Sequence, residues 1–288
     1  MQKLIENFFK EMTDSKLDVK NKILHKTVNQ CIDDLDQGKL KLCTYDSDKN
    51  IWTLHEWLKQ SILLFFKINK MEVVLSDNFS FVDKIPLKQW TKEQGVRVVP
   101  QALARKGSFI ESGCILMPSY INIGAHVGAG TMIDTWATIG SCAQVGKNVH
   151  VSGGVGLGGV LEPLQARPVI IEDNVFLGSR VSVVEGFLVK QSAVIASGVN
   201  LTASTYIIDV SGEFENYESK INNKKVFDDN GARIFKLEVP ENAVVIQGTR
   251  NKVFKKGEYP VSCALIIGKR SESTDKKTSL NQVLRDIN

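Results

Sequence analysis

A bulky apolar side chain returns at every sixth position through the middle of this chain. The series runs without a break from Leu103 to Leu157 and resumes, after a glycine-rich interruption, from Ile171 to Ile207. Its members are Leu103, Phe109, Ile115, Ile121, Val127, Ile133, Ile139, Val145, Val151, Leu157, Ile171, Leu177, Val183, Val189, Ile195, Leu201 and Ile207. The residue four positions after each member is mostly small or β-branched, as at Ala125. A period of six fits neither an amphipathic helix nor the two-residue alternation of a strand.

Short strands and turns that repeat every six residues are typical of the hexapeptide repeat of a parallel β-helix. Three repeats close one triangular coil of eighteen residues, so Ile115, Ile133 and Val151 are expected to stack in the interior of neighbouring coils. Stacked strands lie ~4.8 Å apart. The pattern predicts three coils over residues 103–157 and two more over 171–207, which makes the chain mainly β.

The interruption between Gly153 and Pro168 adds eight residues to the six-residue count. An inserted loop near 158–168 is therefore expected to project from one corner of the prism. Its neighbourhood holds five glycines within seven positions, namely Gly153, Gly154, Gly156, Gly158 and Gly159. Each glycine alone fits an ordinary turn, but glycines also let a backbone approach another group closely. Their clustering beside an insertion favours a loop that faces a ligand.

The segments that flank the repeats have other patterns. Residues 1–96 are expected to form a mostly helical domain, because apolar residues keep helical spacing through most of the first 70 positions. Residues 97–210 are expected to form the β-helix with its inserted loop. Residues 211–288 are expected to contribute a small β-rich region of strands and a short terminal helix.

Composition narrows the class of protein. The 288 residues carry a net charge of +4 with no basic block, which gives no indication of nucleic-acid binding. The five cysteines form no CxxC pair and their number is odd, which fits a reducing cytoplasm better than a disulfide framework. The N-terminus has no signal-peptide core, and the longest aliphatic–aromatic run, Ile62 to Phe66, is too short to cross a bilayer. A cytoplasmic protein without membrane contact is expected.

Two motifs inside the repeats are more specific than the period itself. They are DTWATIGSCAQVGKNVH at 134–150 and GGVLEPLQA at 158–166. With the surrounding stretch from Met117 to Asn174 and the RVVP at 97–100, they closely resemble the tetrahydrodipicolinate N-succinyltransferases. The likeness extends over the helical N-terminal third and, more loosely, over the C-terminal strands, so it spans nearly the whole chain.

The resemblance implies a left-handed β-helix and a homotrimer in which each active site lies between two neighbouring β-helices. It also implies a reaction, in which a succinyl group passes from succinyl-CoA to the amino group of ring-opened tetrahydrodipicolinate. The product, N-succinyl-2-amino-6-oxopimelate, lies on the diaminopimelate and lysine pathway. The resemblance implies succinyl-CoA as a co-substrate, with no permanently bound cofactor and no metal.

This chemistry requires a base, because an amine that attacks a thioester must lose a proton. Asp134 is the candidate, since it directly follows the repeat residue Ile133 and falls in the DTW motif, although a turn-capping role is the alternative. Near VVEG, the resemblance implies an acidic residue with a catalytic role, but the matching position here is Ser182. Glu185, three residues further on, is the second catalytic candidate.

The acceptor is a dicarboxylate, so a guanidinium group or hydroxyl groups should bind it. Arg97, in the RVVP segment, and Arg180 are the candidate carboxylate ligands. By their places in the shared motifs, Trp136 and Ser141 resemble substrate contacts, as does the candidate base. Gly159, at the start of GVLEPLQ, resembles a backbone contact to the ligand.

Three other functions are compatible with the fold. The first is the same acceptor with acetyl-CoA as donor, although the motifs as written here favour succinyl-CoA. A zinc carbonic anhydrase needs three histidines around one metal, but only His126 and His150 lie in the repeats, 24 residues apart and therefore on different faces. The third is a non-catalytic trimerisation scaffold. Only Asp134 and the intact loop motifs argue against it.

Overall fold

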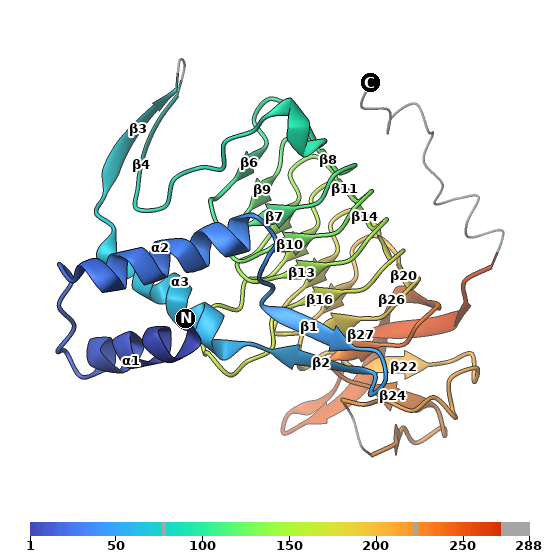
Figure 1. The fold of residues 1–288 in the computed structure, drawn as a ribbon. Coiled ribbons are helices and arrows are strands. Elements are labelled where there is room, and N and C mark those ends of the chain that lie inside the picture. The colour runs from blue at the N-terminus through green and yellow to red at the C-terminus, as the bar shows by residue number, and fades with distance from the viewer. Residues whose placement is uncertain (77–78, 222–223, 272–288) are drawn as a thin grey trace.

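A prism of stacked, short parallel strands occupies the middle of the molecule (Figure 1). The computed structural model describes residues 1–76, 79–221 and 224–271. A helical domain packs against one side of the prism, and C-terminal strands lie at its far end (Figure 1). Three parallel sheets form the faces of the prism. This is the left-handed parallel β-helix that the six-residue period and the shared motifs predict.

Each face of the prism is defined by its strands. Face A consists of β6 (Leu103–Ala104), β9 (Tyr120–Ile121), β12 (Thr138–Ile139), β15 (Gly156–Leu157), β18 (Ser182–Val183) and β21 (Asn200–Leu201). Face B consists of β7 (Phe109–Ile110), β10 (His126–Val127), β13 (Gln144–Val145), β16 (Ile170–Ile171), β19 (Leu188–Val189) and β25 (Glu238–Val239). Face C consists of β5 (Arg97–Val98), β8 (Ile115–Leu116), β11 (Met132–Ile133), β14 (His150–Val151), β17 (Phe176–Leu177), β20 (Val194–Ile195) and β26 (Ala243–Phe254). The turns between faces form the A–B, B–C and C–A corners.

The interior of the prism is a continuous apolar column. The second residue of each short strand points inward, as do the residues four positions later. Ile133, Val151 and Leu177 are fully buried and lie in register on neighbouring coils. The predicted stacking of Ile133 on Val151 is therefore confirmed. Because each coil adds the same apolar contacts and the same backbone hydrogen bonds, the repeat alone is enough to specify this part of the fold.

The first coil is one residue out of the predicted frame. Leu116, and not Ile115, aligns with Ile133, while Ile115 pairs with Met132. The reason is a shortened repeat, since the equivalent positions Leu116 and Ile121 are five residues apart (121 − 116) instead of six. The prediction for Ile115 is wrong because its neighbour is equally apolar, and the sequence does not show which of the two enters the core.

The prism ends earlier than the repeat count predicts. After β21 the chain leaves the prism, and Ile207 pairs with C-terminal strands outside the coils, so its predicted place in the count is wrong. The C-terminal elements are β22 (Ile207–Asp209), β23 (Val226–Phe227), β24 (Arg233–Phe235) and β27 (Gly257–Lys269). The chain returns at β25, where Val239 lies beside Val189. The predicted helix near 280–287 lies outside the described residues.

Three helices form the core of the N-terminal domain. They are α1 (Gln2–Thr13), α2 (Lys22–Asp36) and α3 (Glu56–Ile68). The side chain of Asn21 caps α2 by accepting hydrogen bonds from two N–H groups of its first turn. Ser61 interrupts the apolar stripe of α3 and is buried. Its hydroxyl donates to Leu58 O at 2.7 Å and accepts from the thiol of Cys31 at 3.1 Å, so the polar group is satisfied.

The N-terminal domain also contains two hairpins that the sequence pattern did not predict. They are β1 (Cys43–Asp46) with β2 (Ile51–Leu54), and β3 (Glu72–Ser76) with β4 (Phe79–Asp83). Cys43 of the β1–β2 hairpin packs against Ile170 and Leu188 on face B. At the A–B corner, Ile123 and Cys142 join the core of the helical domain. Among the described residues, no helix has the length and apolar character needed to cross a membrane.

Candidate active site

The candidate site residues occupy two corners of the prism, on either side of face A. The C–A corner carries Asp134, Trp136 and Arg180. The A–B corner carries Ser141, Gly159 and Glu185. Arg97 lies apart from both groups, on the first strand of face C. Within one chain, the structure therefore assembles the predicted residues into two clusters and not into a single pocket.

The two carboxylate oxygens of Asp134 have different surroundings. Oδ1 accepts hydrogen bonds from the N–H of Thr135 at 2.6 Å and from its hydroxyl at 3.2 Å. Oδ2 has no hydrogen-bond partner among the described residues. On the next coil lies Gly153, at which an added Cβ would come within 4.0 Å of this oxygen. The carboxylate is thus fixed through one oxygen, while the other remains available to a substrate. Sequence reasoning missed Thr135, whereas Gly153 belongs to the glycine cluster that the sequence predicts to face a ligand.

Trp136 and Arg180 hold equivalent places in the C–A corner. Both adopt left-handed backbone angles, with φ of +60° and +58°, and both are exposed. The left-handed region disfavours residues with a Cβ, so a tryptophan that is 67% exposed there is an unusual choice for the fold alone. Gly154 lies between them, and an added Cβ there would lie 3.3 Å from Arg180 Cγ. The corner therefore presents an indole and a guanidinium group to the surroundings.

Ser141 and Gly159 are in contact at the A–B corner. A Cβ added at Gly159 would lie 2.6 Å from Ser141 Oγ and 2.8 Å from Ser141 N, so only glycine fits. Val160 N–H donates to Ser141 O at 3.1 Å. Within the described chain, neither the N–H of Gly159 nor the hydroxyl of Ser141 makes a hydrogen bond. This corner thus offers two donors to a ligand.

Much of the glycine cluster has a structural explanation. A Cβ at Gly158 would meet Val184 Cγ1 at 2.9 Å on the next coil, and one at Gly140 would meet the N of Gly159 at 2.2 Å. Gly154 has a φ of +70°. Close stacking of coils and corner geometry therefore account for these glycines, whereas Gly153 faces the open side of the candidate base.

Ser182 and Glu185, the two positions near VVEG, lie on different parts of the prism. Ser182 is on face A, between Gly156 and Asn200 of the neighbouring strands. Glu185 is exposed at the A–B corner, where Oε2 accepts a hydrogen bond from Ala203 N–H at 2.8 Å. Face A separates it from Asp134 within the chain. The second carboxylate is therefore not placed to assist the first within one chain.

Arg97 opens face C. It pairs with Ile115 at the start of β8, and its side chain is exposed. The strand order β5–β8–β11 puts it two strands away from the coil that leads into Asp134. Arg97 thus lies on the same side of the prism as the C–A corner, but nearer the N-terminal end of the stack.

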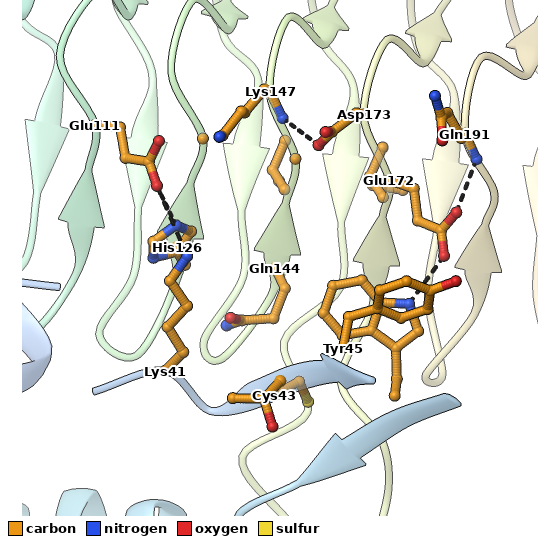
Figure 2. A pocket seen from close by; sticks show the side chains of 16 residues that line it. Lys41, Cys43, Tyr45, Glu111, His126, Gln144, Lys147, Glu172, Asp173 and Gln191 are labelled. Carbon is orange, nitrogen blue, oxygen red and sulfur yellow. Dashed lines mark hydrogen bonds and ion pairs between the residues drawn. The ribbon is translucent and has the colours of Figure 1, made fainter. Parts of the chain in front are cut away.

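A cavity of about 430 Å³ lies elsewhere, between the β1–β2 hairpin and face B (Figure 2). None of the predicted site residues lines it. Trp52 Nε1 donates to Glu172 Oε1 at 2.9 Å, and Glu172 Oε2 accepts from Gln191 N–H at 2.9 Å. Asp173 accepts from the N–H of Lys147 at 2.7 Å. Most of the acidic groups are therefore already bonded within the chain, so the cavity is no better a candidate than the two corners.

His126 and Glu111 form the other end of this cavity, 3.0 Å apart. Burial, assisted by the charge of Lys41, lowers the pKa of His126 to about 4, so the ring is a neutral donor near pH 7. Burial acts to raise the pKa of Glu111, but hydrogen bonds from Ala129 N–H and His126 hold it below its usual value. The pair is a half-buried hydrogen bond that joins the residue after β7 to β10 of face B.

The remaining reactive side chains do not form a second site. His126 is on face B and His150 on face C, as their spacing predicts, so they cannot share one zinc ion. Among the described residues, no group of three or more His, Cys, Asp or Glu could hold a metal. Cys142 lies inside the DTW-containing motif but is fully buried, and burial raises the pKa of its thiol to about 12. It is therefore a packed core residue and not a nucleophile.

Comparison with known proteins identifies the family. Residues 1–68 match the N-terminal domain of tetrahydrodipicolinate N-succinyltransferase, and residues 168–203 match the hexapeptide repeat of succinyl-transferase. A 2,3,4,5-tetrahydropyridine-2,6-dicarboxylate N-succinyltransferase from Acinetobacter baylyi is 44% identical, over 91% of this chain and 90% of its own. The chain belongs to the tetrahydrodipicolinate N-succinyltransferase family. A family member of the same name from Sodalis glossinidius is 40% identical, over 100% of this chain and 98% of its own.

One solved structure supports the fold of the family. It comes from Campylobacter jejuni and is described as a 2,3,4,5-tetrahydropyridine-2-carboxylate N-succinyltransferase. The TM-score is 0.53 at 20% sequence identity, and the match covers 88% of this chain but 63% of that one. The sequence relatives confirm the family predicted from the two motifs, whereas the roles of individual residues stay predictions.

Proposed function

We propose that this protein transfers the succinyl group of succinyl-CoA to the amino group of ring-opened tetrahydrodipicolinate. The observation that carries the proposal is the 44% identity with a curated N-succinyltransferase over nine-tenths of both chains. The product is N-succinyl-2-amino-6-oxopimelate, which serves the diaminopimelate and lysine pathway. The cysteines of the described residues are all free and buried, which fits action in a reducing cytoplasm.

Asp134 is the proposed general base. Its Oδ2 takes a proton from the acceptor amine as the nitrogen attacks the thioester carbonyl, while Thr135 holds Oδ1. The C–S bond then breaks, the amide forms, and the CoA thiolate leaves and takes up a proton. The carbonyl oxygen becomes negatively charged during the attack and needs hydrogen-bond donors. The unengaged N–H of Gly159 and hydroxyl of Ser141 are the proposed donors.

The two corners form one site in our proposal only when two chains meet. The C–A corner would supply Asp134, Trp136 and Arg180, and the A–B corner of a neighbouring chain would supply Ser141 and Gly159. Arg180 and Arg97 would hold the two carboxylates of the acceptor, because a guanidinium group matches a carboxylate with two parallel hydrogen bonds. The exposed Trp136 supports this arrangement, since a neighbouring chain would cover an apolar side chain that is 67% exposed in the single chain.

A thiol-release assay tests the proposal directly. The purified protein is mixed with tetrahydrodipicolinate and either succinyl-CoA or acetyl-CoA, and free CoA is measured with a thiol reagent. We expect turnover with succinyl-CoA that depends on the acceptor, and much slower turnover with acetyl-CoA. Faster release from acetyl-CoA would assign the chain to N-acetyl transfer, and no acceptor-dependent release with either donor would leave the scaffold alternative.

A further inference from the structure

The ammonium group of Lys59 lies deep in the protein, where helix α3 meets the β-helix. Its side chain is fully buried. Nζ donates a hydrogen bond to Ala166 O at 2.7 Å and approaches Pro163 O at 3.4 Å. Both carbonyls belong to the inserted loop 158–168, more than one hundred residues further along the chain. The helical domain therefore holds the loop through hydrogen bonds from one cationic side chain.

This cation is poorly explained by stability alone. None of the ion pairs formed by the described residues includes Lys59. Burial lowers its pKa, which shows that the surroundings disfavour the charged form. Removing an ammonium group from water without a carboxylate partner costs free energy that an apolar side chain of similar length would not. What Lys59 adds over such a side chain is directional hydrogen bonding to the loop.

A second cation, Arg167, holds the loop directly after Ala166. Arg167 donates from Nε and Nη2 to Gly186 O at 2.9 and 2.7 Å, and Nη2 also reaches Leu237 O at 3.3 Å. Ahead of both anchors in the sequence, Leu161 packs against the core of the helical domain. The loop is thus fixed to α3 on one side and to the A–B corner on the other.

We propose that Lys59 is a positioning residue for the acyl transfer described above, and the inference rests on that proposed function. The loop begins at Gly159, which packs on Ser141, and Val160 N–H donates to Ser141 O at 3.1 Å. By holding Pro163 and Ala166, Lys59 keeps this first part of the loop against the A–B corner. The N–H of Gly159 and the hydroxyl of Ser141 then stay unengaged and available to the acyl donor. Lys59 itself touches no substrate.

The test compares Lys59→Met with Lys67→Met, a matched control on the exposed side of α3. Hydrogen exchange of the backbone amides in 160–167 reports the loop without any substrate, and steady-state kinetics with thermal unfolding report the site and the fold. For Lys59→Met we expect exchange at least about tenfold faster and kcat/KM about tenfold lower, because a small displacement of catalytic groups has a large kinetic effect. The melting temperature should change little, and the control should match the wild type.

Several results would overturn the inference. One is unchanged exchange in the loop of Lys59→Met, and another is a loosened loop with unchanged kinetic constants. A third is a lower melting temperature with full activity in the folded fraction, which would indicate only domain attachment. If Lys59→Met does not fold, Arg167→Met releases the loop at the position after Ala166 and should give the same kinetic loss. If the proposed function itself is wrong, the wild-type protein will already show no acceptor-dependent thiol release.

Discussion

The surroundings of Asp134 suit its proposed role in proton transfer. Two hydrogen bonds from Thr135 fix Oδ1, and Gly153 leaves space beside Oδ2. A capping aspartate in an ordinary turn would satisfy only the first of these observations. The open second oxygen therefore favours the catalytic interpretation over the turn-capping one.

Asp134→Asn should lower turnover by ~10²–10⁴-fold, the usual contribution of a positioned general base. Asparagine has nearly the same shape and its Oδ1 still accepts from Thr135, so the fold should be unchanged by circular dichroism. Steady-state thiol release measures the effect. Near-wild-type turnover in this variant, together with an inactive Glu185→Gln, would transfer the role of base to Glu185.

Arg97 should act on the acceptor and not on the acyl donor. Arg97→Ala should raise the KM for the dicarboxylate about thirtyfold, or ~2 kcal/mol, the scale of a lost charge-assisted hydrogen bond. Arg97→Lys should raise it less, because the charge remains but the planar fork is lost. The KM for succinyl-CoA serves as the internal control and should stay nearly constant. Equal weakening for both substrates would mean that Arg97 supports a contact between subunits.

At the scale of elements, the sequence predicts the six-residue period of the strands well. It predicts less well which residue of each strand points into the core. The six-residue count identifies the prism from Ile121 onward, but Ile115 and Leu116 are both apolar, so the shortened repeat between them and Ile121 is invisible. Ile207 satisfies the count because it is buried, although it lies on a strand that pairs with β24 and β27 outside the coils. Short hairpins such as β1–β2 have too few alternating positions to predict from pattern.

The candidate site, too, is predicted from the sequence only in part. The two motifs identify Asp134, Ser141 and Gly159 because their residue types are specific. The supporting contacts are different, because Thr135 is an ordinary turn residue in sequence and Lys59 an ordinary helix residue. The partner of Thr135 is the neighbouring Asp134, and the partners of Lys59 lie more than one hundred positions away, but the sequence pattern shows neither contact.

The contact between face B and the N-terminal domain should make stability depend on pH. The pKa of His126 is lowered from 6.5 to about 4, so between these values the unfolded chain binds more protons than the folded one. Stability should therefore be fully present above pH 6.5 and be lost as pH falls toward 4. The contribution is on the order of 3 kcal/mol.

His126→Phe removes this titration while keeping a ring beside Phe109. Urea unfolding at several pH values should show a shallower loss of stability between pH 6.5 and 4 than in the wild type. His25→Gln, a change on helix α2 away from face B, is the control and should keep the wild-type slope. Parallel curves for His126→Phe and the wild type would contradict the assignment.

At the scale of the whole molecule, the division of the site between two corners fits the homotrimer with shared sites that the family resemblance implies. Asp134→Asn and Gly159→Ala should each be nearly inactive alone, the second because its Cβ would meet Ser141 Oγ at 2.6 Å. Mixed trimers of the two variants should regain part of the activity, because some sites then combine an intact corner from each chain. A monomer in sedimentation at micromolar concentration, or inactive mixed trimers, would exclude a shared site.

The departure of the chain after β21 has a consequence for solubility. A stack of parallel coils would otherwise end in open strand edges that invite end-to-end polymerisation. Here β26 continues face C but pairs with β27 in the opposite direction, and β25 occupies the end of face B. We therefore expect the C-terminal region to prevent growth of the stack into a fibre. A chain shortened to end at Leu201 should lose this protection and form large particles in light scattering, whereas the full chain should not.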